Sequence, residues 1–354
     1  MTNRELFHEI MHYGAFDRMP VVHWTGWTET LERWYGEGLP RDANIHEFLD
    51  TKPHWTFVWM NLGLFPRFEE ETREETADYR IYRDAEGVVC QAWKHQSNIP
   101  HYLDFTLKTP QDWEQYRKRL QPNPARIPAD IDEAIARAQA SGLPIAVETG
   151  SLMGWIRNWM GVENLAYFMY DHEDLYAEMV MTIADLVCWA LHHVLPKVKV
   201  DFGFGWEDIC GRSGPFVSPP IFERCVAPAY RKIRATLEQY GVHMYGVDSD
   251  GDVTALVKPW LDAGVNMLFP IEVGTWHADG MAYRKKYGHE LRIIGHFDKM
   301  TLERGQDAVR AELQRLRPLM KDGGYWPMPD HLITPGVSLD TYRWYLDQMR
   351  AIRL

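Results

Sequence analysis

Acidic and histidine side chains follow a series of apolar runs in the last third of the chain, and a helical stretch follows each run. Carboxylates and imidazoles that meet at one point can bind a divalent metal or exchange protons with a substrate. The runs are Val242–Val247, Val265–Ile271, Leu291–Gly295 and Tyr325–Pro329, followed by Asp248 and Asp250, Glu272, His296 and Asp298, and Asp330 and His331. Runs of strand length that alternate with helices predict βα units, whose strand ends meet at one face.

The same pattern occurs earlier in the chain, where candidate strands end near His23 and Trp24, at Glu148, and at Glu207 and Asp208. We expect strands near residues 21, 145, 202, 244, 268, 293 and 326, with an eighth in His54–Met60. The predicted fold is therefore α/β, a (β/α)8 TIM barrel. Residues 66–95 have hairpin and turn chemistry, which predicts a small antiparallel β insertion over the barrel mouth. No linker divides the sequence, so residues 1–354 are expected to form a single domain.

Composition excludes some classes of function. The chain has 354 residues and a formal net charge of −12, which argues against nucleic acid as a partner. No apolar run approaches the roughly 18–20 residues that span a bilayer, and Met1–Met11 lacks the apolar core of a signal peptide. We expect a cytoplasmic protein. The four cysteines have no metal-binding or redox spacing and are interpreted as structural thiols.

The chain contains 15 tryptophans, and several stand near expected strand ends or in the early loops. Most of them are expected to pack in the core. Trp24, Trp27 and Trp206 could instead wall a substrate pocket together with His23, because indole rings suit an aromatic or a cationic ligand.

Any one of the strand-end acids could simply cap the following helix. Several acids at one mouth, however, repel one another unless a cation or a shared proton offsets the repulsion. Carboxylate with imidazole is a ligand set that suits zinc or another divalent metal. A metal-free acid/base site, in which one carboxyl with a raised pKa donates a proton, remains the alternative.

Several segments spread over nearly the whole chain resemble the uroporphyrinogen decarboxylase superfamily, in particular its corrinoid-linked methyltransferase branch. The similar segments are Asn3-Arg4-Glu5 with Asp17–Pro20, Ser213–Pro219 with Phe222 and Pro228, Asp248–Asp252, Gly295–Asp298, and Gly323–His331 with Pro335. The resemblance is specific to the superfamily and leaves the activity within it open.

Departures from the family pattern narrow the function that the resemblance implies. True decarboxylases have an arginine-rich stretch after the first strand, which holds the propionate groups of the substrate, whereas His23–Trp27 contains no arginine. The methyltransferases have a zinc site of one histidine and two cysteines, and the matching positions are Asp248, Asp250 and His331. Glu272 matches a family acid near the metal. The site is thus free of thiols and rich in oxygen, so a thiol as methyl acceptor does not fit.

The resemblance implies a methyltransferase that removes a methyl group from a small methoxylated aromatic compound or a methylated amine. A separate corrinoid protein would accept the methyl group, and methoxylated aromatics are expected to fit the tryptophan-rich loops best. Asp248, Asp250, Glu272 and His331 would hold a divalent metal, with zinc the expected ion. Residues Glu148, Glu207 and His296 would orient or protonate the substrate.

Two other functions fit the same sequence. One is a metal-free decarboxylase or lyase that acts on a small carboxylate or a tetrapyrrole-like substrate. The other is a non-catalytic barrel that binds a tetrapyrrole or a corrinoid-related ligand.

Overall fold

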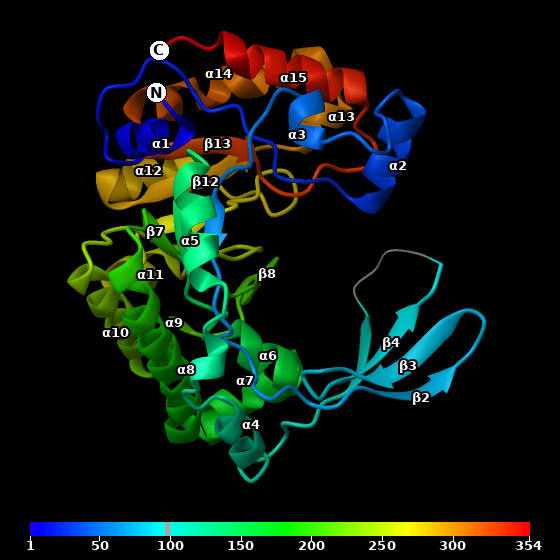
Figure 1. The fold of residues 1–354 in the computed structure, drawn as a ribbon, viewed down its shortest axis with the longest axis vertical. Helices are drawn as coiled ribbons and strands as arrows, with labels where there is room; N and C mark the ends of the chain where they lie inside the picture. The colour runs from blue at the N-terminus through cyan, green and yellow to red at the C-terminus, as the bar shows by residue number, and fades with distance from the viewer. Residues whose placement is uncertain (96–99) are drawn as a thin grey trace.

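The computed structural model describes residues 1–95 and 100–354, and a seven-stranded parallel sheet with the order β1-β6-β7-β10-β11-β12-β13 forms its centre. The strands are β1 (Thr56–Val58), β6 (Ile145–Glu148), β7 (Phe202–Trp206), β10 (Tyr245–Asp248), β11 (Met267–Phe269), β12 (Arg292–Phe297) and β13 (Tyr325–Pro329). The sheet curls into a TIM-barrel-like half-barrel, and helices cover its outer side (Figure 1). This confirms the predicted α/β class.

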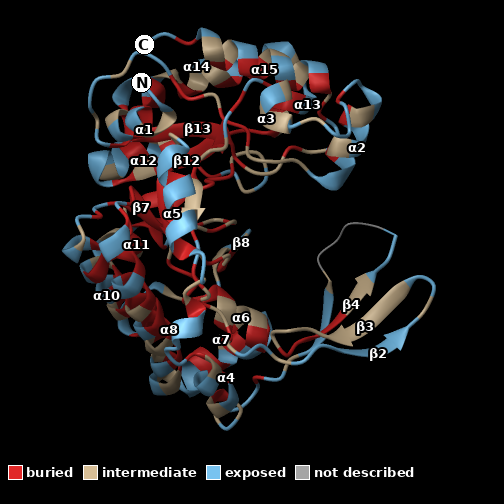
Figure 2. Ribbon diagram, in the orientation of Figure 1, coloured by how far each residue is buried: buried red, intermediate tan, exposed pale blue. Residues whose placement is uncertain are grey.

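The helices alternate with these strands along the chain. They are α1 (Asn3–Met11), α2 (Thr28–Gly36), α3 (Ile45–Phe48), α4 (Trp113–Arg119), α5 (Ile131–Ala140), α6 (Gly154–Met160), α7 (Val162–Asp171), α8 (Glu173–Val194), α9 (Pro219–Ile221), α10 (Ala227–Gln239), α11 (Val257–Asp262), α12 (Gly280–Tyr287), α13 (Met300–Glu303), α14 (Gln306–Asp322) and α15 (Leu339–Ala351). Buried residues line the sheet and the inner helix faces, whereas the outer helix faces are exposed (Figure 2).

The strand expected near residue 21 does not form a ladder. Val22 bridges Lys52, which precedes β1, and Gly26 bridges Ile333, which follows β13. Both partners lie outside the regular strands, so the segment crosses between the two sheet edges and makes one bridge at each. This arrangement places Trp24 between the edges, at the carboxyl end of the sheet.

The predicted insertion is present and larger than expected. Its strands β2 (Glu71–Glu75), β3 (Tyr79–Arg83), β4 (Val89–Trp93) and β5 (His101–Asp104) form an antiparallel sheet in sequence order. This sheet stands out from the barrel (Figure 1). The Trp159 indole of α6 anchors its base by donating a 2.7 Å hydrogen bond to the Glu86 carboxylate. Another short hairpin pairs β8 (Cys210–Gly211) with β9 (Gly214–Pro215).

One helix is more apolar than the sequence pattern suggested. The segment Glu173–Lys197, which contains α8, is long and apolar enough to cross a membrane, but 61% of its most apolar window is buried inside the protein. Buried side chains such as Met179, Ile183 and Leu191 join the core. Packing in the core explains this composition.

Candidate active site

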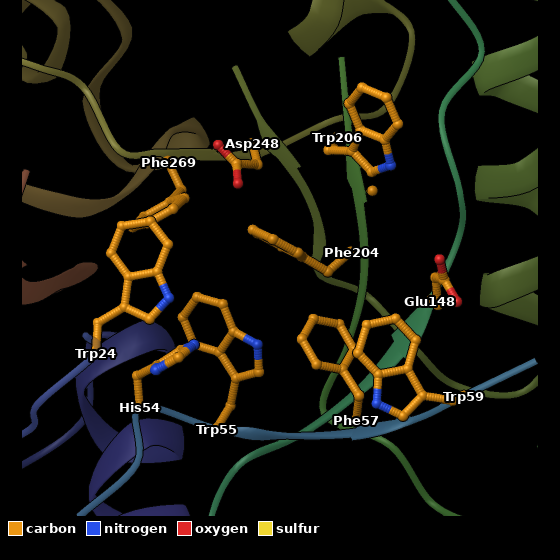
Figure 3. A pocket seen from close by; sticks show the side chains of 11 residues that line it. Trp24, His54, Trp55, Phe57, Trp59, Glu148, Phe204, Trp206, Asp248 and Phe269 are labelled. Carbon is orange, nitrogen blue, oxygen red and sulfur yellow. The ribbon is translucent and has the colours of Figure 1, made fainter. Parts of the chain in front are cut away.

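A cavity of about 220 Å³ opens at the carboxyl ends of the barrel strands (Figure 3). Its lining residues are Trp24, His54, Trp55, Phe57, Trp59, Glu148, Phe204, Gly205, Trp206, Asp248 and Phe269. The strand register explains why these residues meet. Glu148 ends β6 opposite Phe204, and Asp248 ends β10 opposite both Trp206 and Phe269. Ligand sites of TIM barrels lie at this face.

Aromatic rings form most of the cavity wall. Trp24 meets Phe269 edge-on with ring centroids 5.1 Å apart, and the rings of Trp55 and Phe204 are also 5.1 Å apart. Phe57 lies 4.5 Å from Trp59, whose side chain at the cavity rim is 55% exposed. These contacts hold the rings in place, so the cavity exists before a ligand binds.

A cluster of carboxylates adjoins the cavity. Side-chain oxygens of Asp208, Asp248 and Asp250 lie within 4.8 Å of one another, and so do ligand atoms of Asp250, Glu272 and His331. Asp250 belongs to both groups. The ring of Trp24 lies 5.7 Å from the ring of His331, which places the cavity wall directly against the cluster.

Two basic side chains offset part of this negative charge. The buried ammonium of Lys299 lies 2.8 Å from Glu272 Oε2 and 4.0 Å from Asp330 Oδ1. His331 Nε2 lies 3.4 Å from Asp250 Oδ2. A buried carboxylate near a basic group stays charged far more readily than an isolated one. The cluster is therefore a network in which Glu272 and Asp250 each have a basic partner.

The cluster perturbs the pKa values of its members in opposite directions. Burial, then the charges of Asp208 and Asp250, raise the pKa of Asp248 well above its usual range. Burial and the Asp250 charge likewise raise the pKa of Asp208. Burial also acts to raise the pKa of Asp250, but the hydrogen bond and charge of His331 outweigh it and the pKa is lowered. Asp248 and Asp208 thus hold a proton more readily than a free aspartate, whereas Asp250 ionises more readily.

Glu148 lies on a different side of the cavity from Asp248 (Figure 3). Burial raises the pKa of this carboxyl to about 7. A carboxyl with such a pKa can hold or release a proton near neutral pH, which is the property of a general acid or base.

Three of the six non-glycine residues with positive φ in the described structure lie at or near these strand ends. Asp208, Ile271 and His296 are non-glycine residues with φ values of 47°, 48° and 60°. The left-handed region is costly for such residues, especially for β-branched isoleucine, and strain of this kind is common at functional sites. The turns at Asp208 and Ile271 redirect the chain directly after Glu207 and directly before Glu272.

A model of uroporphyrinogen decarboxylase (URO-D) matches residues 80–352. The chain belongs to the uroporphyrinogen decarboxylase family. The fold is similar to that of a methyltransferase from Methanosarcina mazei, with a TM-score of 0.62 and 15% sequence identity over 99% of this chain and 98% of that one. A B12-independent methionine synthase from Shewanella sp. W3-18-1, in complex with selenomethionine, matches 66% of this chain and 68% of its own, with a TM-score of 0.42 and 11% identity. No curated protein sequence matches the chain.

The fold brings together most of the site residues that we expected from the sequence. Trp24, Trp206, Glu148 and Asp248 line the cavity, and Asp250, Glu272 and His331 lie in the adjoining cluster.

The other expected residues lie outside the cavity wall. His23 is buried, with Nδ1 2.8 Å from the Tyr342 hydroxyl, and burial lowers its pKa to about 3. Trp27 precedes α2 and is 38% exposed. His296 is fully buried, with Nδ1 3.2 Å from the Ile271 carbonyl oxygen and Nε2 3.2 Å from the Gly280 amide.

Glu207 also lies outside the cavity wall, and its carboxylate organises the start of α6. Its carboxylate accepts hydrogen bonds from the amides of Leu152, Met153 and Gly154 at 3.0, 2.7 and 2.9 Å. The hydroxyls of Ser151 and Tyr230 also donate to it. The residue is 1% exposed. Carboxylates favour helix N-termini because the free amides there carry partial positive charge.

Lys299 and Asp208 were not assigned to the site from the sequence. Asp208 carried the strand-end signal that marks the other acids, since it directly follows Glu207. Lys299 follows Asp298 after β12, and a lysine after a strand carries no such signal by itself. Its amide donates a 3.0 Å hydrogen bond to Asp330 Oδ1, which fixes the backbone from which the ammonium reaches Glu272.

Replacing Glu207 by alanine is expected to lower the free energy of unfolding by about 3 kcal/mol or more, because several buried donors lose their acceptor. Urea unfolding measures the change. The exposed control Glu163→Ala should stay within about 0.5 kcal/mol of the wild type. An unchanged unfolding midpoint for Glu207→Ala would contradict the structural role of this carboxylate.

Glu148 predicts a pH dependence of stability. Its pKa is raised to about 7 in the folded state. The contribution of the protonated carboxyl to the free energy of unfolding is therefore complete below about pH 4 and is lost as the pH rises through about 7. Between pH 5 and pH 8 the wild type should lose about 2 kcal/mol of unfolding free energy relative to Glu148→Gln. Urea titrations of both proteins across this range measure the difference, and parallel curves would refute the assignment.

Proposed function

We propose that this protein is a cytoplasmic methyltransferase that removes a methyl group from a small methoxylated aromatic compound or methylated amine. A separate corrinoid protein would accept the methyl group. The observation that carries the proposal is the aromatic cavity set directly against the cluster of carboxylates and His331. Membership of the uroporphyrinogen decarboxylase family and the fold shared with a Methanosarcina mazei methyltransferase support it.

A divalent metal, with zinc the expected ion, fits the cluster. Two tetrahedral ligands at about 2.1 Å from one zinc ion lie roughly 3.4 Å apart. His331 Nε2 and Asp250 Oδ2 have a separation of 3.4 Å, and Glu272 offers a third ligand atom within 4.8 Å of both. Asp208 and Asp248 form a second group of possible ligands with Asp250. A bound metal would supply Lewis acidity toward an oxygen or nitrogen atom of the substrate.

The cavity residues have separate tasks in this proposal. The rings of Trp24, Trp55 and Trp206 enclose the substrate and exclude water, which strengthens electrostatic interactions inside the cavity. Glu148 holds or gives up a proton near neutral pH at its carboxyl oxygen.

A second cavity of about 480 Å³ adjoins the cluster and gives the methyl acceptor a route of approach. Asp208 and Asp250 contribute to its wall, together with Arg157 of α6 and Tyr102 of β5. The antiparallel sheet therefore takes part in shaping the entrance. In the proposal, the corrinoid of the partner protein approaches from this side.

A metal-free decarboxylase or lyase that acts on a small carboxylate is the second candidate. The observation that favours it is Lys299, whose ammonium already occupies one side of Glu272. The composition of the cavity disfavours it, because the described residues that line the cavity include no arginine or lysine to hold a substrate carboxylate.

Metal analysis separates these two functions. After loading with zinc and gel filtration, the wild type should retain about one metal ion per chain, and His331→Ala should lose at least nine-tenths of it. His243→Ala, which changes an exposed histidine outside the cluster, should retain the metal. A wild-type protein without bound metal would favour the metal-free function.

Methyl transfer tests the proposed activity directly. Metal-loaded protein is mixed with a reduced corrinoid protein and a panel of methoxybenzoates and methylated amines, and methylation of the corrinoid is followed by its absorbance. At least one substrate should react, and His331→Ala should slow the reaction at least a hundredfold. No methyl transfer from any member of the panel would overturn the proposal, and carbon dioxide release from a carboxylate would support the alternative.

A further inference from the structure

The cavity combines aromatic rings and carboxylates in a pattern that selects for charge. Its wall carries the rings of Trp24, Trp55, Trp59 and Trp206, besides three phenylalanines, and two carboxyl groups, those of Glu148 and Asp248. His54 is its one lining side chain of a basic type within the described part of the chain, and burial lowers the pKa of this imidazole to about 3, so the ring is neutral. The cavity wall therefore has two carboxyl groups that can carry negative charge and, among the described lining residues, no group that carries positive charge.

Electrostatics then rank the possible ligands. The face of an aromatic ring carries negative charge density and attracts an organic cation, most strongly for tryptophan. A carboxylate beside the rings adds to this attraction. A methoxybenzoate, in contrast, would bring its own carboxylate next to Glu148 or Asp248 without an arginine or lysine to hold it.

We propose that the cavity binds a small quaternary ammonium compound between its tryptophan rings and Glu148. Building on the proposed methyltransferase function, this identifies a methylated ammonium compound, rather than a methoxylated aromatic acid, as the methyl donor. Figure 3 shows Glu148 on a different side of the cavity from Asp248, which is the member of the carboxylate cluster that lines the cavity. The cation and the metal thus have separate positions.

The chemistry of transfer agrees with this ligand. The bond between the methyl carbon and nitrogen breaks, and its electron pair remains on nitrogen, so a neutral tertiary amine leaves without needing a proton. The nucleophile of the reduced corrinoid protein supplies the electron pair of the new bond to the methyl carbon. Neither Glu148 nor the aromatic wall has to donate a proton in this step, which suits a wall made mostly of rings.

Choline and its uncharged carbon analogue 3,3-dimethyl-1-butanol test the proposal, because the two molecules have the same shape and differ in charge. Isothermal titration calorimetry with the full-length protein should show choline binding at least tenfold more tightly than the alcohol. 4-Methoxybenzoate should bind more weakly than choline. Equal binding of choline and the alcohol, or tighter binding of 4-methoxybenzoate, would overturn the proposal.

Matched variants locate the site. Trp59→Leu and Glu148→Gln should each weaken choline binding at least fivefold and leave binding of the alcohol within twofold. Trp93→Leu, which changes a tryptophan of similar exposure on β4, and Glu47→Gln, on the surface of α3, should bind choline like the wild type. Thermal unfolding checks that each variant is folded. Unchanged choline binding in both folded cavity variants would place the cation elsewhere and refute the assignment.

The outcomes separate this inference from the proposed function. Choline binding in the cavity, without methyl transfer from any methoxybenzoate, methylated amine or quaternary ammonium compound, would refute the methyltransferase and leave the cation site standing. Methyl transfer from a methoxybenzoate by a protein that does not bind choline would do the reverse.

Discussion

Repulsion among carboxylates at the carboxyl end of the sheet is the constraint on which the rest of the site depends. Asp208, Asp248 and Asp250 lie close together because the parallel strands that carry them are neighbours. Like charges at such distances in a partly buried place are strongly unfavourable. The structure relieves the repulsion in two ways. Basic groups neutralise Asp250 and Glu272, whereas Asp248 shifts toward its protonated form.

This balance of charge bears on the metal binding that we propose. A metal ion bound by Asp250 and His331 would add positive charge beside Asp248 and Asp208, which would lower the raised pKa values of these two carboxyls. Lys299 would weaken the binding of a metal ion to Glu272, because its ammonium already stabilises the charge of this carboxylate.

Sequence patterns could predict the architecture of the site much better than its contacts. Apolar runs of strand length determine the parallel sheet, and the residues that end these runs meet because strands in register bring their carboxyl ends to one edge. Trp24 and Glu148 were found in this way. The first expected strand failed because its bridges involve Lys52 and Ile333, and no local pattern reveals partners so distant in the sequence.

The roles of individual strand-end residues could not be predicted for a related reason. Glu207 and Glu148 carry the same signal in the sequence, but Glu207 turns toward the amides of residues 152–154 and Glu148 lies at the cavity. The left-handed backbone at Asp208 changes the chain direction directly after Glu207. The direction in which each of these carboxylates points depends on tertiary packing, which the sequence pattern does not show.

The cavity and the carboxylate cluster are two adjacent but separate regions of the site. An aromatic wall lowers the local dielectric, so each remaining charge acts more strongly than it would in water. Trp24 contacts Phe269 on the cavity side and His331 on the cluster side, and its ring therefore divides the two regions while keeping them adjacent. A substrate cation beside Glu148 and a metal ion beside Asp250 would repel each other if both were bound. The carboxyl group of Asp248, which belongs to both the cavity wall and the cluster, lies where its ionised form would screen that repulsion. The raised pKa of Asp248 follows from its burial and from the neighbouring charges of Asp208 and Asp250.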